Sequence, residues 1–417
     1  MELGSHTLSS NDRRALLAVC GVAFALRFAF ISEVHPAPVS DFEWYYLHAA
    51  ALLHGQGFTT NGYPTAFWPL GWPYFLAGVF AIFGTNVFVA EVTQAVLNSL
   101  TAGLVFLIAQ RIAGTLAGIV SGMIYAILPS AVEWCAVLAS EPLYTFLWAL
   151  TTYIWLRVGH RQQAWFALSG VLIGAAALVR PTAIFLWGVL LIYLFFASSP
   201  RTLKSVLLPP LIVFVFAAAT ITPDLIRNYR VFHAFVLISN NGGPTLWSGN
   251  NPYYRPGDWS LHDDRLQKMT EDPRTELQAE QITTRMAIAY IKSHPGRIAA
   301  LALPKLKALY GNDDDGPMEY AFETTRSMPL GRAVLIINRA VYYPVLLLAL
   351  AGLILCVRSA WTPAGVHPGW MLVVLNILYN TLPFLILPAY DRYHFPSMPY
   401  FVVFAGIAVA VFLAQHA

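Results

Sequence analysis

The feature of this sequence that most restricts its fold is a series of long apolar blocks. The blocks run for about 16 to 25 residues, and roughly 20 apolar residues let a helix cross a hydrocarbon core of about 30 Å. Backbone polar groups inside a bilayer must be paired within the protein, so blocks of this length are predicted to be helices. Ten membrane spans are predicted: 15–33, 87–110, 114–130, 142–158, 164–179, 181–197, 204–222, 336–356, 369–388 and 397–414.

The composition agrees with a chain whose main solvent is lipid. Hydrophobic residues make up 57% of the chain and charged residues 11%, whereas about a quarter of the residues of a soluble domain are charged. We therefore predict an all-α polytopic membrane protein with one transmembrane domain over residues 1–417, and we exclude a soluble one. The net charge of +3 gives no information on partners, because the side of the membrane on which each Lys or Arg lies matters more than the total. No nucleic-acid partner is predicted.

One further apolar segment, Leu70–Phe83, decides the topology. It has about 14 residues, starts in a cluster of prolines and ends at Gly84, which favours an interfacial helix over a span. With ten spans and a cytoplasmic N-terminus, most basic loop residues face the cytoplasm, as the positive-inside rule requires. These residues are Arg111, Arg157, Arg161, Arg201, Lys204 and Arg358. Counting Leu70–Phe83 as a span would place all of them outside.

Two outer segments stand apart from the spans. Residues 34–86 form the first outer loop, in which we predict a helix over 42–54. Residues 223–332 form a long outer section rich in Asn, Gly, Pro and charge. Within it, helical spacing of apolar residues predicts amphipathic helices over 275–293 and 298–309, which lie on the membrane or cap a cavity.

Two carboxylates at the outer level are candidates for catalysis. Asp41 lies among aromatic residues in the first outer loop, where a carboxylate can take the proton of an acceptor hydroxyl. The alternative role is capping of the following helix, and one residue can fill both roles. Glu141 lies at the start of a predicted helix, where the helix dipole favours an anion. Two acids from distant loops are what a site needs to orient a sugar acceptor or to support a base.

Three arginines lie at the same level. Arg180 falls between two predicted spans, Arg227 follows the seventh span and Arg392 precedes the last one. Arginines at a membrane boundary commonly extend to water without further function. Three above one bundle can instead hold a lipid-linked phosphate, because a guanidinium matches phosphate oxygens in a bidentate way. Arg27, inside the first span, is expected to pair with a carboxylate such as Glu33 or to face a polar cavity.

Several short motifs follow one another in a characteristic order. They are Asp41-x3-Tyr45, Pro69-x-Gly71-x-Pro73, Ser140–Glu141–Pro142, Arg180–Pro181–Thr182, Ile226–Arg227–Asn228–Tyr229, Asn241–Gly242–Gly243, Gly249–Asn250–Asn251–Pro252 and Arg392–Tyr393–His394–Phe395–Pro396. With these motifs the chain resembles the GT-C superfamily of glycosyltransferases. Within that superfamily it resembles the dolichyl-phosphate-mannose protein mannosyltransferases and the bacterial lipid A aminoarabinose transferases.

The resemblance implies an inverting transfer of a sugar from a polyprenyl-phosphate-linked donor to a hydroxyl acceptor of the cell envelope, namely a glycolipid, a polysaccharide or a protein. The reaction is expected at the periplasmic or exterior face of the inner (cytoplasmic) membrane, without metal or cofactor. Asp41 aligns with the proposed base and Glu141 with the second acidic position. Donor phosphate binding is assigned to Arg227, Arg180 and Arg392. Substrate binding is assigned to Glu43, Tyr45, Asn250 and His394.

Two other functions are compatible with the same residues. A transporter or flippase of lipid-linked sugars would have interrupted helices and ionisable groups near the middle of the membrane, whereas the charges of this chain gather at the outer rim. An oligosaccharide polymerase or ligase would share the lipid donor and the outer loop but would transfer a block of sugars.

Single cysteines test the predicted topology, in a background without the three native cysteines. The positive-inside rule places residue 114 on the cytoplasmic side and residue 258 on the outer side. In intact cells, a membrane-impermeant thiol reagent should label Asp258→Cys and should label Gly114→Cys only after the membrane is opened. The reverse pattern would remove both the topology and the predicted site.

Overall fold

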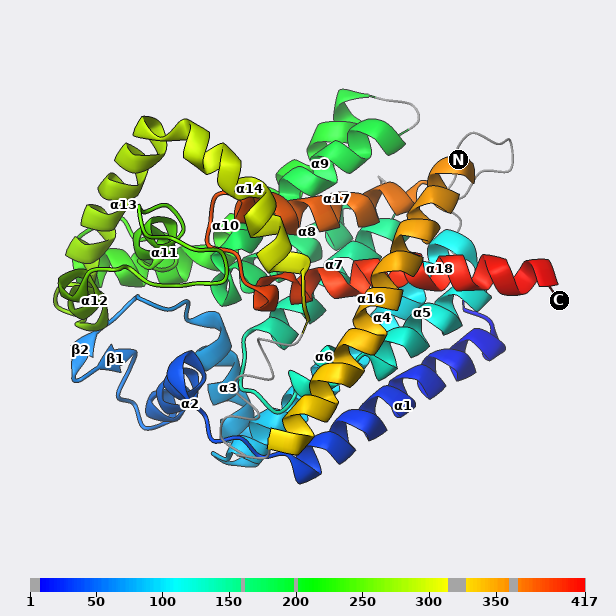
Figure 1. Cartoon of the computed structure of the whole chain (residues 1–417), viewed down its shortest axis with the longest axis horizontal. Coiled ribbons are helices and arrows are strands. Elements are labelled where there is room, and N and C mark those ends of the chain that lie inside the picture. Colours follow the sequence, from blue (N-terminus) through cyan, green and yellow to red (C-terminus); the bar gives the residue numbers. More distant parts are fainter. Residues whose placement is uncertain (1–7, 159–161, 199–201, 314–327, 360–366, 417) are drawn as a thin grey trace.

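The fold is that of a computed structural model, which describes residues 8–158, 162–198, 202–313, 328–359 and 367–416. Helices dominate the described chain, and its strands form one short antiparallel hairpin, β1 (Thr59–Thr60) with β2 (Tyr63–Pro64) (Figure 1). The helices that form the bundle are α1 (Ser10–Glu33), α4 (Val87–Ala113), α5 (Thr115–Ile127), α7 (Glu141–Arg157), α8 (Gln163–Val179), α9 (Leu186–Ala197), α10 (Leu203–Phe232), α16 (Met328–Ser359), α17 (Gly369–Thr381) and α18 (Met398–His416). The other helices are α2 (Ser40–Leu53), α3 (Gly71–Phe83), α6 (Pro129–Glu133), α11 (Gly242–Ser248), α12 (Asp264–Glu271), α13 (Glu276–Ser293), α14 (Pro295–Tyr310) and the 3₁₀ helices η1 (Pro181–Phe185), η2 (Leu382–Leu385) and η3 (Asp391–Ser397).

Each of the ten predicted spans coincides with helical structure, and the number of membrane crossings stays a prediction. Among the described residues, five helices are long and apolar enough to cross a bilayer: Ser10–Glu33, Val87–Ala113, Leu203–Phe232, Val334–Ser359 and Asp391–His416. Shorter apolar helices are Gly71–Phe83, Thr115–Ile127, Gln163–Val179, Pro181–Ala197 and Gly369–Leu385. The segment predicted to be interfacial, Leu70–Phe83, forms α3, a helix of 13 residues.

Helix α4 lies at the centre of the bundle, in contact with α1, α5, α7 and α18. Glycines allow the closest helix crossings. A Cβ added at Gly406 of α18 would meet Ser121 of α5, and one added at Gly352 of α16 would meet the backbone of Phe404 in α18. Small residues at a crossing let two backbones approach, and the resulting van der Waals contact holds helices together where lipid provides no hydrophobic driving force.

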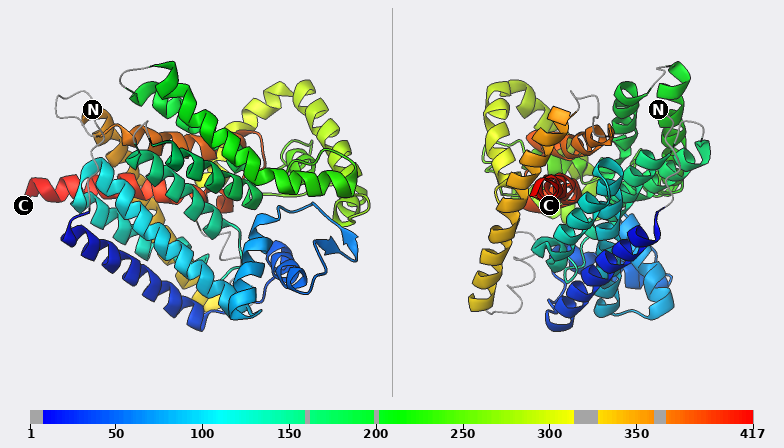
Figure 2. Two further views of the ribbon diagram at one scale, coloured as in Figure 1. Left: turned by 180° about the vertical axis from the view of Figure 1, so that it is seen from behind. Right: turned by 90° about the vertical axis from the view of Figure 1, so that its right-hand side faces the viewer.

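Different parts of the chain lie at the two ends of the bundle. Both chain termini lie at the right-hand end in Figure 1, and α2, α3 and α11 to α13 gather at the left-hand end, as the views in Figure 2 also show. Near the termini, the Thr115 hydroxyl donates to Asp12 at 2.7 Å and Arg111 donates to the Leu156 carbonyl at 3.3 Å. Of the basic residues used to predict the cytoplasmic side, Arg161 and Arg201 lie outside the described residues.

Arg27 shows how the bundle accommodates a charge inside an apolar helix. The side chain is fully buried, and its guanidinium donates to the carbonyls of Ala23 and Ala126 at 2.9 Å and of Tyr125 at 3.1 Å. Tyr125 and Ala126 lie in the last turn of α5, where carbonyls lack intrahelical partners and carry the negative end of the helix dipole. The expected pairing with Glu33 is therefore wrong, because helix-end carbonyls take the place of the carboxylate.

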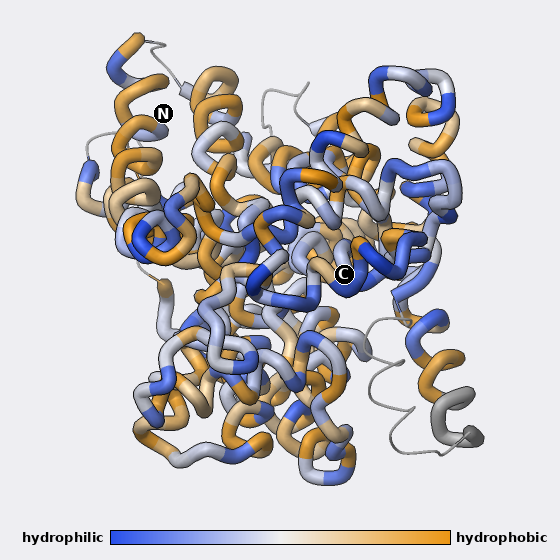
Figure 3. The backbone as a smooth tube through the Cα atoms, turned by 90° about the vertical axis from the view of Figure 1, so that its left-hand side faces the viewer, coloured by the Kyte–Doolittle hydropathy of each residue, from blue (hydrophilic) through white to orange (hydrophobic). Residues whose placement is uncertain are grey.

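The predicted helices of the outer segments are present with shifted ends. The helix predicted over 42–54 is α2, which starts two residues earlier, at Ser40. The amphipathic helices predicted over 275–293 and 298–309 are α13 and α14. Figure 3 views this end of the molecule and shows hydrophilic stretches interleaved with hydrophobic ones.

The helix of the predicted seventh span extends beyond the predicted span. The helix expected to end at residue 222 continues through Pro223 to Phe232, so the outer section predicted over 223–332 begins on α10. A proline removes one helical hydrogen bond, but neighbouring groups can satisfy the freed carbonyl and the helix then continues. Residues 314–327 of that section lie outside the described residues.

Gly352 provides a test of the packing between α16 and α18. An alanine at this position would press its Cβ against the Phe404 carbonyl, and backbone cannot move aside as a side chain can. We expect Gly352→Ala to destabilise the purified protein by about 1–3 kcal/mol, measured as a lower melting temperature in detergent. Gly78→Ala is the matched control, because a Cβ at this position of α3 meets nothing within 4 Å. Equal melting temperatures for the two variants would contradict the packing.

Candidate functional site

Asp41 lies in the first turn of α2. Ser40, with φ of 55°, turns the chain into the helix, and the N-cap position is held by Val39, which makes no side-chain cap. The capping role considered for Asp41 is therefore wrong. The Asp41 carboxylate instead accepts a hydrogen bond from Nη2 of Arg392 at 2.7 Å.

Asp41 belongs to a network of four charged side chains, called here the charge network: Asp41, Arg392, Glu141 and Arg180. Arg392 binds Asp41 through Nη2 and Glu141 through Nε, and Nη1 of Arg180 lies 2.7 Å from the same Oε1 of Glu141. Glu141 is fully buried, and Asp41 is 7% exposed. Buried charges are tolerated when they are paired, and this network holds two negative and two positive groups. The two predicted acids therefore meet, as expected, together with two of the three predicted arginines.

The members of the charge network reach it from the ends of helices. Glu141 is the first residue of α7 and is followed by Pro142, a residue favoured in the first helical turn. Arg180 follows the last residue of α8 and precedes Pro181; the residue before a proline prefers an extended backbone, which Arg180 adopts. Arg392 lies in η3, just before α18. The backbone preferences at these helix ends thus orient three segments that are distant in the sequence so that their side chains meet.

Aromatic rings surround the two arginines of the charge network. The guanidinium carbon of Arg392 lies 4.9 Å from the centre of the Phe42 ring and 6.0 Å from that of Trp134. The guanidinium of Arg180 lies 5.5 Å from the centre of the Tyr393 ring. Ring faces attract cations, and the attraction increases when water is excluded. The rings therefore help to hold the two guanidinium groups in place, and of the two arginines Arg392 lines the cavity described below.

Tyr45, predicted to bind substrate, lies one helical turn after Asp41. The ring is buried and packs edge-on against Trp44 and Trp68, with centroids 5.8 Å and 6.3 Å away. Burial raises the pKa of the Tyr45 hydroxyl, and the nearby Asp41 carboxylate raises it further. Tyr45 is thus a neutral phenol that supports the wall next to the charge network.

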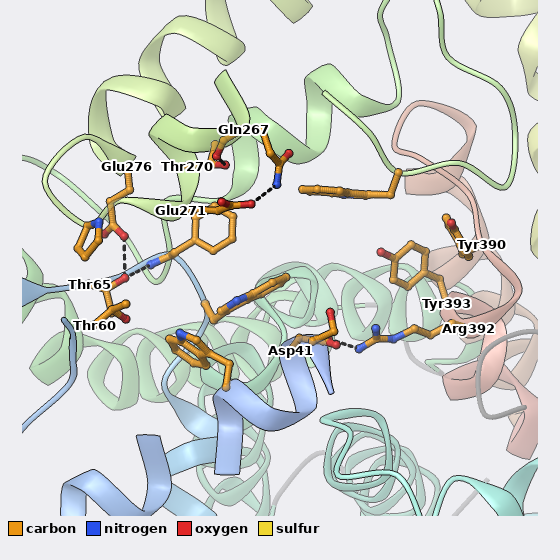
Figure 4. Close-up of a pocket in the computed structure, with 16 residues that line it drawn as sticks. Asp41, Thr60, Thr65, Gln267, Thr270, Glu271, Glu276, Tyr390, Arg392 and Tyr393 are labelled. Carbon is orange, nitrogen blue, oxygen red and sulfur yellow. Dashed lines mark hydrogen bonds and ion pairs between the residues drawn. The ribbon is translucent and has the colours of Figure 1, made fainter. Parts of the chain in front are cut away.

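A cavity of about 480 Å³ opens beside Asp41 and Arg392. Figure 4 shows this pair on one wall and residues of α12 on the opposite wall. Six aromatic residues line the cavity: Trp44, Phe67, Trp68, Trp259, Tyr390 and Tyr393. Clefts of this size with apolar walls and a few polar groups are typical of small-molecule sites. The cavity is therefore the candidate active site.

Glu276 joins the first outer loop to the second outer section at the rim of the cavity. Its carboxylate accepts hydrogen bonds from the Thr65 hydroxyl at 2.6 Å, the Ala66 N–H at 2.8 Å and the Asn240 side chain at 2.8 Å. Burial raises the pKa of Glu276, and these three hydrogen bonds act in the opposite direction. The residue lines the cavity, but both of its oxygens are occupied by the protein.

Arg227 lies apart from the charge network. Its guanidinium donates to the carbonyls of Thr65 at 2.9 Å and Phe58 at 3.1 Å, and to the side chain of Asn228 at 2.8 Å. These contacts hold the first outer loop against α10. The assignment of Arg227 to donor phosphate stays a prediction, and its present partners are protein oxygens.

Three other predicted substrate-binding residues are not among the residues that line the cavity. Glu43 is exposed on α2. His394 is fully buried and contacts the Leu309 carbonyl at 2.5 Å and Asp313 at 3.0 Å. Asn250 is also fully buried. Their roles in substrate binding stay predictions.

Asn250 and Lys305 hold the segment that leads to Arg392. Both donate to the carbonyl of Ile386, Asn250 at 2.9 Å and Lys305 at 2.5 Å, and Lys305 also donates to the carbonyl of Gly249 at 3.0 Å. Gly249 packs so closely on Pro388 that a Cβ would lie 2.5 Å from the proline nitrogen. The Gly249–Asn250 motif therefore fixes the backbone immediately before the Arg392 segment.

Sequence reasoning missed the part of the cavity wall that α12 and the loop before it contribute. Gln267, Thr270 and Glu271 line the cavity from α12, and Trp259 lines it from the preceding loop. A short polar helix has no periodicity that distinguishes a wall from a solvated surface. The local signal that was available is Trp259, a large aromatic residue in a polar stretch.

Comparison with known proteins gives a family match and a structural match for this chain. Residues 68–226, less than half of the chain, match the model of the dolichyl-phosphate-mannose-protein mannosyltransferase family. A search among curated proteins finds no match. The apo structure of the Archaeoglobus fulgidus oligosaccharyltransferase superimposes with a TM-score of 0.60 at 16% identity, covering 97% of this chain and 51% of the other. The chain has a GT-C fold.

Two further structures show the extent of this similarity. The complex of the A. fulgidus oligosaccharyltransferase AglB with an inhibitory peptide and a dolichol-phosphate matches with a TM-score of 0.58 at 13% identity, over 97% of this chain and 51% of the other. ArnT from Cupriavidus metallidurans bound to undecaprenyl phosphate matches with a TM-score of 0.44 at 15% identity, over 95% of this chain and 77% of the other. This chain spans about half the length of the oligosaccharyltransferase. The predicted resemblance to the GT-C superfamily is confirmed by the family match and by the fold shared with the oligosaccharyltransferase.

Lys305 makes the stability of the site dependent on pH. Burial lowers the pKa of Lys305 to about 8, whereas a lysine in an unfolded chain has a pKa of about 10.4. Between these values the unfolded state binds more protons, so the free energy of unfolding should rise as pH increases from about 8 to 10. We expect the melting temperature of wild type to gain a few degrees relative to Lys305→Met over this range.

The control for this measurement is Lys307→Met, which removes an exposed lysine from the same helix. Its melting temperature should follow the wild-type curve, because the Lys307 side chain is exposed in the folded protein. Parallel curves for wild type and Lys305→Met would contradict the assignment.

Proposed function

We propose that this protein is a membrane glycosyltransferase that transfers a sugar from a polyprenyl-phosphate-linked donor to a hydroxyl acceptor on the outer side of the cytoplasmic membrane. The observation that carries the proposal is the position of Asp41 and Arg392 side by side on the wall of the cavity, with Glu141 and Arg180 behind them. A carboxylate and guanidinium groups are the base and the phosphate ligands that such a transfer requires.

The proposed reaction is one displacement at the anomeric carbon. The acceptor oxygen forms the new bond to this carbon while the bond to the phosphate oxygen breaks, and the electron pair leaves with the polyprenyl phosphate. Asp41 takes the acceptor proton. Arg392 and Arg180 stabilise the charge on the departing phosphate. The energy is supplied by the sugar–phosphate bond of the donor, and the attack from the opposite side inverts the anomeric configuration.

The pairing of Asp41 with Arg392 determines when Asp41 can act as the base. The Asp41 oxygen that binds Arg392 is occupied by that contact, so it has to be released before it can take the acceptor proton. A donor phosphate competes with Asp41 for the N–H donors of Arg392. We infer that donor binding exchanges the partner of Arg392 and thereby frees Asp41 for the acceptor.

Glu141 has a positioning role in this proposal. It is fully buried and binds both arginines through one oxygen, so it holds them in place when Asp41 is released. Removing one member of a buried ion pair leaves an uncompensated charge and is strongly destabilising. Substitution of Glu141 therefore tests folding as well as catalysis and is less informative than substitution of Asp41.

The reaction is tested by thin-layer analysis of lipid-linked sugars incubated with the purified protein. A glycosyltransferase converts the donor to polyprenyl phosphate with loss of one sugar unit. An oligosaccharide polymerase or ligase removes a chain of sugars, and a flippase leaves the donor chemically unchanged. Either of the latter results would overturn the proposal.

Asp41→Asn separates the base from the structural roles of this residue. The amide cannot take the acceptor proton, so transfer should fall by about a hundredfold or more. Binding of polyprenyl phosphate should instead become tighter, because the competing carboxylate at Arg392 is gone. This tightening should be absent when Arg392→Lys is combined with Asp41→Asn, since the guanidinium that exchanges partners is then missing.

The control is Glu33→Gln, which removes an exposed carboxylate at the end of α1 and should leave transfer and phosphate binding unchanged. Near wild-type turnover in Asp41→Asn would eliminate Asp41 as the base. Tightening of the same size with and without Arg392 would eliminate the partner exchange.

A further inference from the structure

The wall of the cavity opposite Asp41, called here the α12 wall, consists of Trp259, Gln267, Thr270 and Glu271. Helix α12 is fixed in place at both ends. The Asp263 carboxylate caps it by accepting from the N–H groups of Arg265 and Leu266 at 2.9 Å and 3.0 Å. After its last turn, the hydroxyl of Thr275 donates to the Met269 carbonyl at 2.9 Å. The α12 wall is therefore a preorganised surface.

The polar groups of the α12 wall keep part of their hydrogen-bonding capacity. The Gln267 amide donates to Oε1 of Glu271 at 2.7 Å, one helical turn away. That bond leaves the amide oxygen of Gln267 and the second oxygen of Glu271 for other partners. The Thr270 hydroxyl donates to the carbonyl of Gln267 at 2.7 Å. Two planar acceptors next to each other suit a pair of neighbouring hydroxyl groups.

Flat indole rings complete the surface around these acceptors. Trp259 comes from the loop before α12, and Trp44 and Trp68 come from the first outer loop. The Trp44 ring is held by stacking on His48, with centroids 3.7 Å apart and an angle of 25°. An indole offers a wide apolar face that complements the C–H face of a sugar ring, while acceptor groups at its edge bind the hydroxyls.

The charges of the residues that line the cavity restrict the charge of a ligand that can bind there. Asp41, Glu271 and Glu276 supply three carboxylates, and the one cationic residue among the lining residues that the structure describes is Arg392, which Asp41 and Glu141 already neutralise. An anionic ligand between Glu271 and Asp41 would meet repulsion from these carboxylates. An uncharged or cationic ligand is favoured.

We propose that the α12 wall is the acceptor subsite and that the acceptor is a saccharide, uncharged or cationic, whose hydroxyl faces Asp41. This inference rests on the proposed function and specifies its acceptor. One common mode of peptide recognition is the addition of an extended acceptor segment to an exposed strand edge. In the described part of the chain the two strands pair with each other and have two residues each, whereas the α12 wall presents side-chain acceptors and ring faces.

Saturation-transfer NMR on the full-length protein in detergent tests the subsite without requiring turnover. The probes are methyl glucoside, methyl glucosaminide and methyl glucuronide, with a Ser/Thr-containing peptide as the alternative acceptor. The first two glycosides should receive saturation and the glucuronide and peptide should not. Trp259→Ala should weaken binding of the glucoside by about tenfold, and Trp259→Phe should retain most of it. Glu271→Gln should weaken discrimination against the glucuronide.

The control variant is Trp165→Ala, which removes a half-exposed tryptophan at the start of α8, far along the chain from the α12 wall. Its glycoside binding should equal that of wild type. Saturation of the peptide alone, or equal glucoside binding in wild type and Trp259→Ala, would overturn the saccharide acceptor subsite.

Release of sugar from the polyprenyl-phosphate donor to water is measured in parallel and reports the proposed function separately. Donor breakdown that persists in a protein without glycoside binding would overturn the acceptor subsite alone. Glycoside binding at the α12 wall without donor breakdown would overturn the glycosyltransferase and, with it, the assignment of the bound saccharide as an acceptor.

Discussion

The bridge from Arg392 to Asp41 and Glu141 is the interaction on which the arrangement of the site depends. It joins the first outer loop, the start of α7 and the segment before α18, which are far apart in the sequence. Because an unpaired charge is costly in a site shielded from water, each member constrains the others. The bridge also sets the position of α2, and therefore of one whole wall of the cavity. Around this bridge, aromatic rings pack against the guanidinium groups of Arg392 and Arg180.

The bundle beneath the site obeys a different constraint. Helices in lipid gain little from hydrophobic association, so they rely on close backbone approach and on complete satisfaction of polar groups. Gly352 and Gly406 provide the approach, and Arg27 satisfies carbonyls at the end of α5. A rigid support of this kind keeps helix ends in register at the outer level. The charge network is built from those ends, so its geometry depends on the crossings below it.

The sequence predicted the helices well because apolar length and helical spacing are local properties. It also predicted that Asp41, Glu141 and Arg392 share one level, since each lies beside the outer end of a span. It did not predict the partners, because pairing depends on distances between segments that no local pattern records. Arg227 was grouped with the other arginines, yet it contacts loop carbonyls, and the partners of Glu276 come from two other segments. The continuation of α10 to Phe232 was not predicted, because the residues from 223 onward were assigned to the polar outer section.

The charge balance of the network also determines which acid can act. Two carboxylates and two guanidinium groups balance each other in the charge network, so in the proposed reaction an arriving donor phosphate adds negative charge and displaces one of the acids. Glu141 is fully buried and bound by both arginines, whereas Asp41 is 7% exposed, bound by one arginine and placed on the cavity wall. The acid with fewer partners and with access to the cavity is the one that is displaced more easily. The electrostatics of the charge network therefore favour the release of Asp41, the carboxylate that the proposed reaction uses as its base.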